Sequence, residues 1–171
     1  MKLLKRICLL QFFLYERQDL EVDGHTAFLG PNGTGKTCLL DAIQTVMLGA
    51  DAGKVHYNAQ ADGKRKDRSL RSYCLGVQDQ SGHGCRPQAS TYIALVFEDQ
   101  MTGERVSAGV SLSAREDSPQ HTVNGLFILP GVDLTTAELV ETRDGAERVI
   151  GWRDIQPRFK ELVQAAGAVK S

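Results

Sequence analysis

The chain of 171 residues has few of the residues that mark several protein classes. It contains a single tryptophan, and aromatic residues make up 6% of the sequence. Its four cysteines form no Cys-x-x-Cys pair and no dense cluster, and they are Cys8, Cys38, Cys74 and Cys85. This spacing argues against a disulfide-stapled secreted scaffold and favours reduced thiols in a cytoplasmic protein. A metal site around His83 and Cys85 lacks the usual zinc spacing and a further ligand.

Charge of one sign and long apolar runs are also missing. The formal net charge is −1, so contact with nucleic acid or an anionic membrane requires a local basic patch. No stretch approaches the roughly 18 apolar residues of a membrane-spanning helix. The apolar run at residues 7–15 follows basic residues, as in a signal peptide, but Gln11 interrupts it and no small-residue cleavage site follows. We interpret the run as a buried strand and predict no membrane association.

What the sequence does contain is a glycine-rich stretch that reads Gly-Pro-Asn-Gly-Thr-Gly-Lys-Thr over residues 30–37. It matches the phosphate-binding pattern G-x-x-x-x-G-K-[ST] in full. Glycines allow the backbone to approach a phosphate closely, so that consecutive amides turn inward around its oxygens. A helix that starts near Lys36 would direct its positive end at the same phosphates. The predicted nucleotide-binding residues are Gly30, Pro31, Asn32, Gly33, Thr34, Gly35, Lys36, Thr37 and Cys38.

Two side chains of the loop carry specific chemistry. Lys36 supplies an ammonium group to the β- and γ-phosphates and is the predicted catalytic residue. Thr37 offers its hydroxyl to Mg²⁺ and is the predicted metal ligand. The alternative interpretation is a glycine-rich strand-to-helix turn that binds no ligand.

Hydrophobic periodicity predicts an α/β domain with a P-loop, a mixed sheet that includes an antiparallel meander, and few helices. Small P-loop kinases and GTPases would alternate strand and helix after the loop, so this order argues against them. The predicted strands are 4–14, 20–22, 25–29, 91–98, 105–113 and 126–129. The predicted helices are 36–48, a short one near 69–73, a capped turn at 135–140 and a last segment at 152–166 with Pro157 at a kink or at its start.

The segment at residues 27–44 resembles the N-terminal half of the ATPase head of SMC-type proteins, the ABC-like ATPases of chromosome and plasmid maintenance. The shared features are Asn-Gly-x-Gly-Lys-[Ser/Thr] followed by Leu-Leu-Asp-Ala-Ile. Two further stretches, at 68–76 and 127–131, resemble the MukB-related branch, and within it the JetC-type subunits of the Wadjet anti-plasmid defence system. The resemblance spans most of the chain.

This resemblance implies that residues 1–171 are the N-terminal lobe of an incomplete ATP-binding head, with ATP and Mg²⁺ as cofactors. In such heads the signature motif and the Walker B strand follow a long coiled coil, and neither is found in this sequence. The implied partners are the C-terminal lobe, a second head in a homodimer, DNA, and kleisin-like and accessory subunits. The chain alone is then expected to bind ATP without hydrolysing it efficiently.

A basic cluster lies in the long polar stretch after the first predicted helix. It can neutralise DNA phosphates without reading sequence, or it can be an ordinary solvated loop. The resemblance assigns Arg68 or Arg71 to an arginine-bearing loop near the nucleotide and the DNA-facing surface. The predicted nucleic-acid contacts are Lys64, Arg65, Lys66, Arg68 and Arg71.

Other candidate residues have two interpretations each. The acidic end of residues 93–99 is either a Mg²⁺-binding pair or, as we favour, an ordinary strand end. Asp41 is either hydrogen-bonded within the domain or an exposed helix carboxylate. Trp152 is favoured as a core residue over a base-stacking one. Phe13 and Tyr15 are candidates for an approach to adenine.

Two other functions compete with an SMC-like motor. One is an ABC-like ATPase of the RecF or OLD-nuclease type in DNA repair or defence. The other is a non-hydrolysing module whose ATP binding only controls assembly.

Overall fold

A five-stranded antiparallel sheet forms the centre of the computed structural model, which describes residues 1–31, 35–51, 54–55, 57, 69–78 and 83–168. The strand order is β2-β1-β3-β4-β5, and each neighbouring pair is antiparallel. The strands of this sheet are β1 (Lys2–Phe12), β2 (Tyr15–Glu21), β3 (Gln88–Asp99), β4 (Arg105–Arg115) and β5 (Thr122–Pro130).

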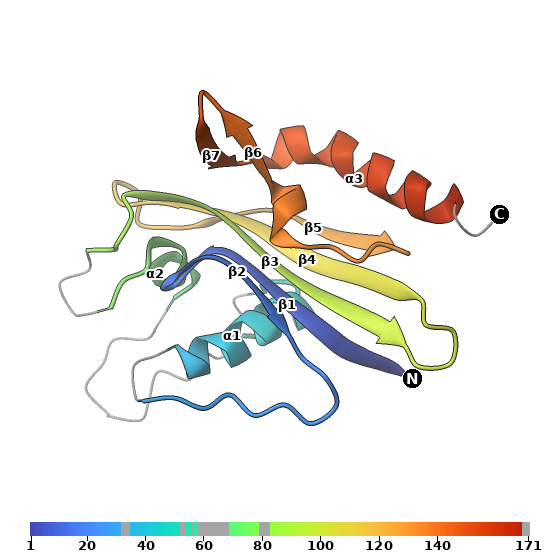
Figure 1. The fold of residues 1–171 in the computed structure, drawn as a ribbon. Coiled ribbons are helices and arrows are strands. Elements are labelled where there is room, and N and C mark those ends of the chain that lie inside the picture. The colour runs from blue at the N-terminus through green and yellow to red at the C-terminus, as the bar shows by residue number, and fades with distance from the viewer. Residues whose placement is uncertain (32–34, 52–53, 56, 58–68, 79–82, 169–171) are drawn as a thin grey trace.

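The remaining elements cover the two faces of this sheet. Helices α1 (Lys36–Met47) and α2 (Leu70–Leu75) lie on one face. The other face carries the 3-10 turn η1 (Thr136–Leu139), the hairpin of β6 (Val140–Arg143) and β7 (Ala146–Val149), and helix α3 (Trp152–Ala168). Figure 1 shows the sheet between these two layers.

The central strands β1 and β3 are buried on both faces. In β1, Ile7 and Leu9 point to the α1 side, while Cys8 and Leu10 point to the α3 side. All four are at most 2% exposed. Side chains alternate along a strand, so a continuous apolar run is what a strand between two covering layers requires.

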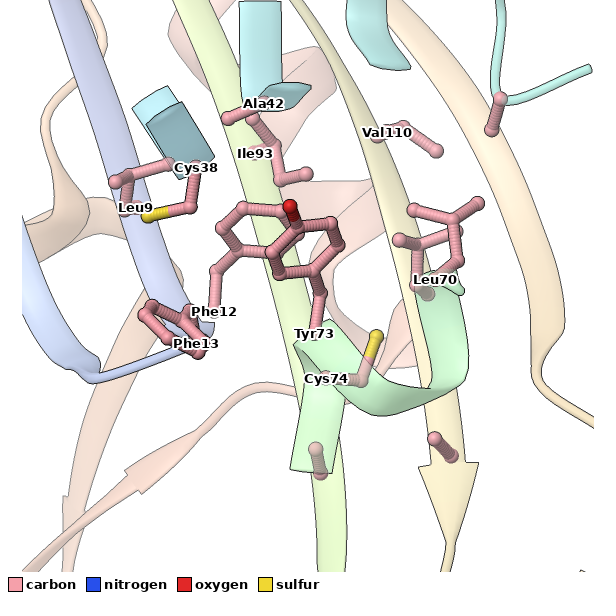
Figure 2. Packing of buried hydrophobic residues seen from close by; sticks show 14 of the residues in the cluster. Leu9, Phe12, Phe13, Cys38, Ala42, Leu70, Tyr73, Cys74, Ile93 and Val110 are labelled. Atoms are coloured by element: carbon pink, nitrogen blue, oxygen red, sulfur yellow. The ribbon is translucent and has the colours of Figure 1, made fainter. Parts of the chain in front are cut away.

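On the α1 side, an aromatic group joins the helices to the end of β1. The rings of Phe12 and Tyr73 stack with their centroids 4.9 Å apart, and Phe13 meets Tyr73 edge-on at 5.9 Å. Figure 2 shows these rings between α2 and the sheet, beside Cys38 and Ala42 of α1. This cluster places α1 and α2 in one continuous core.

Residues next to helix α2 in the sequence cap both of its ends. Ser69 and Ser72 form a reciprocal capping box at its N-terminus. Gly76 ends it with a φ of 71°, and a Cβ there would lie 2.3 Å from the Cys85 sulfur and 2.8 Å from the Phe13 carbonyl oxygen. The short helix predicted near residues 69–73 is therefore confirmed, with its end extended to Leu75.

The sequence-based prediction was right about most of the meander. The hairpin of β3 and β4, the strand β5, helix α1 and the last helix are all present. Helix α3 continues through Pro157. The capped turn exists with its Thr135 and Glu138 capping box, but as a 3-10 turn. The hairpin of β6 and β7 was not predicted.

Two predictions about the sheet were wrong. Residues 25–29 form no strand, and the sheet is antiparallel throughout the described residues instead of mixed. The chain leaves β2 after Glu21, and the Lys5 ammonium pairs with Asp23 at 2.6 Å as it turns away. Residues 25–29 then run toward α1 without pairing with any described strand (Figure 1). Since a strand exists only through its ladder partner, apolar composition alone could not produce one here.

Gly109 provides a test of the packing between the sheet and the α3 layer. A Cβ at Gly109 would lie 2.3 Å from the Phe127 ring and 2.5 Å from the Ile93 carbonyl oxygen. We expect Gly109→Val to lower the free energy of unfolding by about 1–3 kcal/mol or more, because neither the ring nor the backbone can yield easily. Urea denaturation measures this change.

The matched control is Gly167→Ala in α3, where a Cβ meets no atom within 4 Å. It should leave the stability unchanged or slightly raised, because alanine favours a helix over glycine. Equal stability of the two variants would contradict the packing described here.

Candidate functional site

The start of α1 is shaped by Gly35. This residue is the N-cap of the helix, with φ 90° and ψ 9°, and its carbonyl accepts hydrogen bonds from the amides of Cys38 and Leu39. A positive φ favours glycine. A Cβ at this position would also lie 3.3 Å from both the Cys38 sulfur and the Tyr15 hydroxyl. The positive φ therefore favours the glycine that the motif has here, and the space around it is tight.

The N-terminal end of α1 lacks features that would compete with an anion. Among the described residues, no side chain caps the helix and its first turn contains no acidic residue. The first amides of a helix have no partner within the helix, and they carry its positive partial charge. A phosphate at this end would satisfy both.

Lys36 follows the N-cap as the first residue of α1. Its Nζ donates to the carbonyl oxygens of Gly30 at 2.6 Å and Pro31 at 2.7 Å. These two bonds hold the ammonium group against the backbone of the first part of the glycine-rich stretch. Thr37, the next residue, is half-buried in the first turn of α1.

The structure thus brings together six of the nine predicted nucleotide-binding residues, while Asn32, Gly33 and Thr34 lie outside the described residues. Cys38 is the one whose side chain is placed differently. Its thiol is fully buried and donates to the Gly35 carbonyl oxygen at 2.8 Å. The thiol belongs to the core beneath the loop, so Cys38 has only its backbone to offer a ligand.

The two aromatic residues considered for an adenine contact, Tyr15 and Phe13, lie in different surroundings. Tyr15 borders the loop through its contact with Gly35. Partial burial raises its pKa, which keeps the phenol neutral near pH 7. Phe13, in contrast, is 5% exposed and packs against Tyr73, so the prediction for Phe13 was wrong: its ring is a core side chain.

Asp41 is buried, which settles the two interpretations of this residue. It is 1% exposed and accepts a hydrogen bond from the hydroxyl of Tyr73 in α2. The partner of Asp41 was missed, because nothing in the spacing of residues 41 and 73 links them.

The basic cluster is described only at its end. Lys64, Arg65, Lys66 and Arg68 lie outside the described residues. Arg71 donates from Nε to the Ser118 carbonyl oxygen at 2.6 Å and from Nη2 to that of Glu116 at 3.0 Å. These bonds brace α2 against the connection between β4 and β5. Contact of the cluster with DNA stays a prediction.

The remaining candidates have structural roles. Glu98 pairs with Arg105 at 2.8 Å, as expected of an ordinary strand end. Trp152 packs against Phe127 on the α3 side, which confirms it as a core residue. His83 pairs with Glu116 at 2.8 Å, and the described residues contain no group of three metal-ligating side chains.

A hollow of about 500 Å³ lies on the opposite face of the sheet, where the hairpin of β6 and β7 leaves the ends of β1, β3 and β4 uncovered. Sequence reasoning did not find it. Its lining includes Arg17, Ser90, Ser113 and Arg148 and none of the phosphate-loop residues. The hollow is therefore separate from the start of α1.

A family model described as a P-loop containing region of AAA domain matches residues 4–64. This part of the chain is similar to the P-loop regions of NTPases. The match contains β1, β2, the loop and α1, so the P-loop region is also the part of the structure that assembles the open helix end, the ammonium group and the hydroxyl. No curated protein matches the chain. Within the described residues, every helix is too short or too polar to cross a membrane.

The thiols give a test of how the P-loop region is buried. Burial raises the pKa of Cys74 to about 11 and that of Cys8 further, so both remain protonated at pH 8, and the thiolate is the reactive form. Cys38 is also buried, whereas Cys85 is exposed. We expect a thiol reagent at pH 8 to modify Cys85 alone in the native chain.

Mass spectrometry of the alkylated protein measures the modified positions. The same reagent in denaturant should reach all four cysteines, which serves as the control. Rapid native modification of Cys38 or Cys74 would contradict the burial of the helix start.

Proposed function

We propose that this chain is the ATP-binding lobe of a cytoplasmic SMC-like ATPase that translocates or entraps DNA. The observation that carries the proposal is the start of α1. Its N-cap residue is Gly35, no side chain of the described residues caps its first amides, and Lys36 is the first residue of the helix. An apolar ligand would use neither the amides nor the ammonium group. A triphosphate would use both.

The groups present fit MgATP. The helix end and Lys36 would hold the phosphates, and Thr37 would contribute a hydroxyl to Mg²⁺. When bound, the ion neutralises charge that develops on the phosphates during transfer. Lys36 must exchange at least one of its loop carbonyls for a phosphate oxygen, and its flexible stem allows this movement.

The SMC-like assignment is supported by the stretches that carry the resemblance. The Leu-Leu-Asp-Ala-Ile sequence lies within α1, the stretch at 68–76 contains α2, and the stretch at 127–131 begins in β5. By this resemblance the protein is related to the MukB-like JetC subunits of anti-plasmid defence. Its signature and Walker B residues would come from a C-terminal lobe and a second head. Hydrolysis would then require the complete homodimer, with kleisin-like and accessory subunits.

Lys36→Ala tests nucleotide binding. We expect the affinity for MgATP to fall by about 10- to 100-fold, because a hydrogen-bonded charge at the phosphates is lost. Isothermal titration calorimetry on the chain measures the dissociation constant. Lys54→Ala is the control, since Lys54 is an exposed lysine that pairs with Asp51 beyond the end of α1. Unchanged affinity in Lys36→Ala would refute the proposed function.

Charge reversal at Lys64, Arg65 and Lys66 tests the DNA contact. In the full-length dimer we expect DNA-stimulated ATP turnover to fall and its salt dependence to become shallower, because fewer phosphates are neutralised. Turnover without DNA should be unchanged. The control reverses Arg143 and Arg148 on the hairpin of β6 and β7. If the triple variant responds to DNA as the wild type does, the cluster is a solvated loop.

A further inference from the structure

We propose that Asp41 and Tyr73 are a positioning pair: the hydrogen bond from the Tyr73 hydroxyl to the Asp41 carboxylate holds α1 in the orientation that aims its first turn at the phosphates. The inference rests on the proposed function. It assigns a role in nucleotide binding to two residues that would not touch the nucleotide.

Most other core contacts of α1 are apolar, apart from that of Thr45, whose hydroxyl lies 3.3 Å from the Tyr57 hydroxyl. The buried face of α1 consists mainly of Cys38, Leu39 and Ala42, which pack on the sheet. Its outer face is exposed, with Leu40 at 55% and Met47 at 63%. Hydrophobic burial is non-directional, so it permits small rotations and slides of the helix. A hydrogen bond has a preferred distance and angle, and Asp41 supplies one near the middle of α1.

The donor of this bond is held from several directions. The Tyr73 ring stacks on Phe12, and both Phe13 and Tyr57 meet it edge-on. Its backbone carbonyl accepts from the amide of Phe13 at 2.6 Å. Figure 2 shows Tyr73 projecting from α2 toward α1 between Phe12 and Ile93. The position of the Tyr73 hydroxyl, which donates to Asp41, is therefore well defined.

Helix α2 is itself anchored to the sheet. Arg86 donates from Nη1 to the carbonyl oxygens of Cys74 at 2.9 Å and Phe13 at 3.0 Å. Arg71 reaches the connection between β4 and β5 from the other side of the helix, as described above. Through Tyr73, α1 is thus connected to a helix that is bonded to the β1–β2 turn and to the connection between β4 and β5.

Packing alone does not explain why residue 41 is an aspartate. Asp41 is 1% exposed, and no salt bridge reaches it from the described residues. Burying a polar side chain is unfavourable unless it is hydrogen-bonded. An apolar side chain would fill the same volume without that cost. The side chain of Asp41 adds a directional hydrogen bond to the packing of α1. It does so one helical turn after Thr37.

The first test measures binding of MgATP to the 171-residue chain by calorimetry. Tyr73→Phe keeps the ring and removes only the hydroxyl, and we expect about tenfold weaker binding. Asp41→Ala removes the acceptor and should give a similar loss. Asp41→Asn retains a carbonyl oxygen that accepts from Tyr73, so its affinity should stay within about threefold of the wild type. Equal losses in the Asn and Ala variants would overturn the inference.

Tyr92→Phe is the matched control for loss of a buried tyrosine hydroxyl. Tyr92 is also 1% exposed, and its hydroxyl donates to the Ile150 carbonyl oxygen at 2.8 Å on the opposite face of the sheet. Urea denaturation without nucleotide should show that both Phe variants fold and lose similar stability. Only Tyr73→Phe should bind MgATP more weakly. If the two variants bind equally well, the bond between Tyr73 and Asp41 is structural only.

The failure of this inference is distinguishable from the failure of the proposed function. Binding that depends on Lys36 but tolerates Tyr73→Phe would remove the positioning pair and leave the proposed function intact. Binding that ignores Lys36, or no binding by the wild type, would remove both.

Discussion

The double-sided burial of the central strands is the constraint on which the rest of the structure depends. Because β1 and β3 present apolar side chains to both faces, each face needs its own cover. Helices α1 and α2 supply one cover, and η1, the hairpin of β6 and β7, and α3 supply the other. The start of α1 belongs to this arrangement, because Cys38 and Leu39 of its first turn pack in the core on one face of the sheet.

Features that depend on neighbouring residues were predictable from the sequence. The loop motif predicted the start of α1 near Lys36, where the helix begins. The Thr135 and Glu138 capping box predicted the start of η1, and a short helix was predicted near the observed α2. In each case the residues that decide the structure lie within a few positions of one another, so a pattern in the sequence contains the whole interaction.

Features that depend on distant partners were not predictable. Asp41 and Tyr73 meet only because α1 and α2 cover the same face, and no spacing encodes that. Residues 25–29 have the composition of a strand, but they lack a described strand to pair with. The hairpin of β6 and β7 is polar and short, and Asp144 and Gly145 form its turn with positive φ. Its place over the sheet comes from long-range bonds such as that between Arg17 and Glu147.

In the described part of the chain, β2 and β5 are the outer strands of the sheet, and they meet solvent in different ways. β2 is short, and it carries the charged residues Glu16, Arg17, Asp19 and Glu21. β5 exposes Leu126 and Ile128 on the α1 side, but its register with β4 is shifted at one point and it ends at Pro130, which has no amide to donate. Charge at one border and irregular backbone at the other discourage strand-to-strand association between molecules. These features oppose the addition of further strands to the sheet, even though β5 exposes apolar side chains.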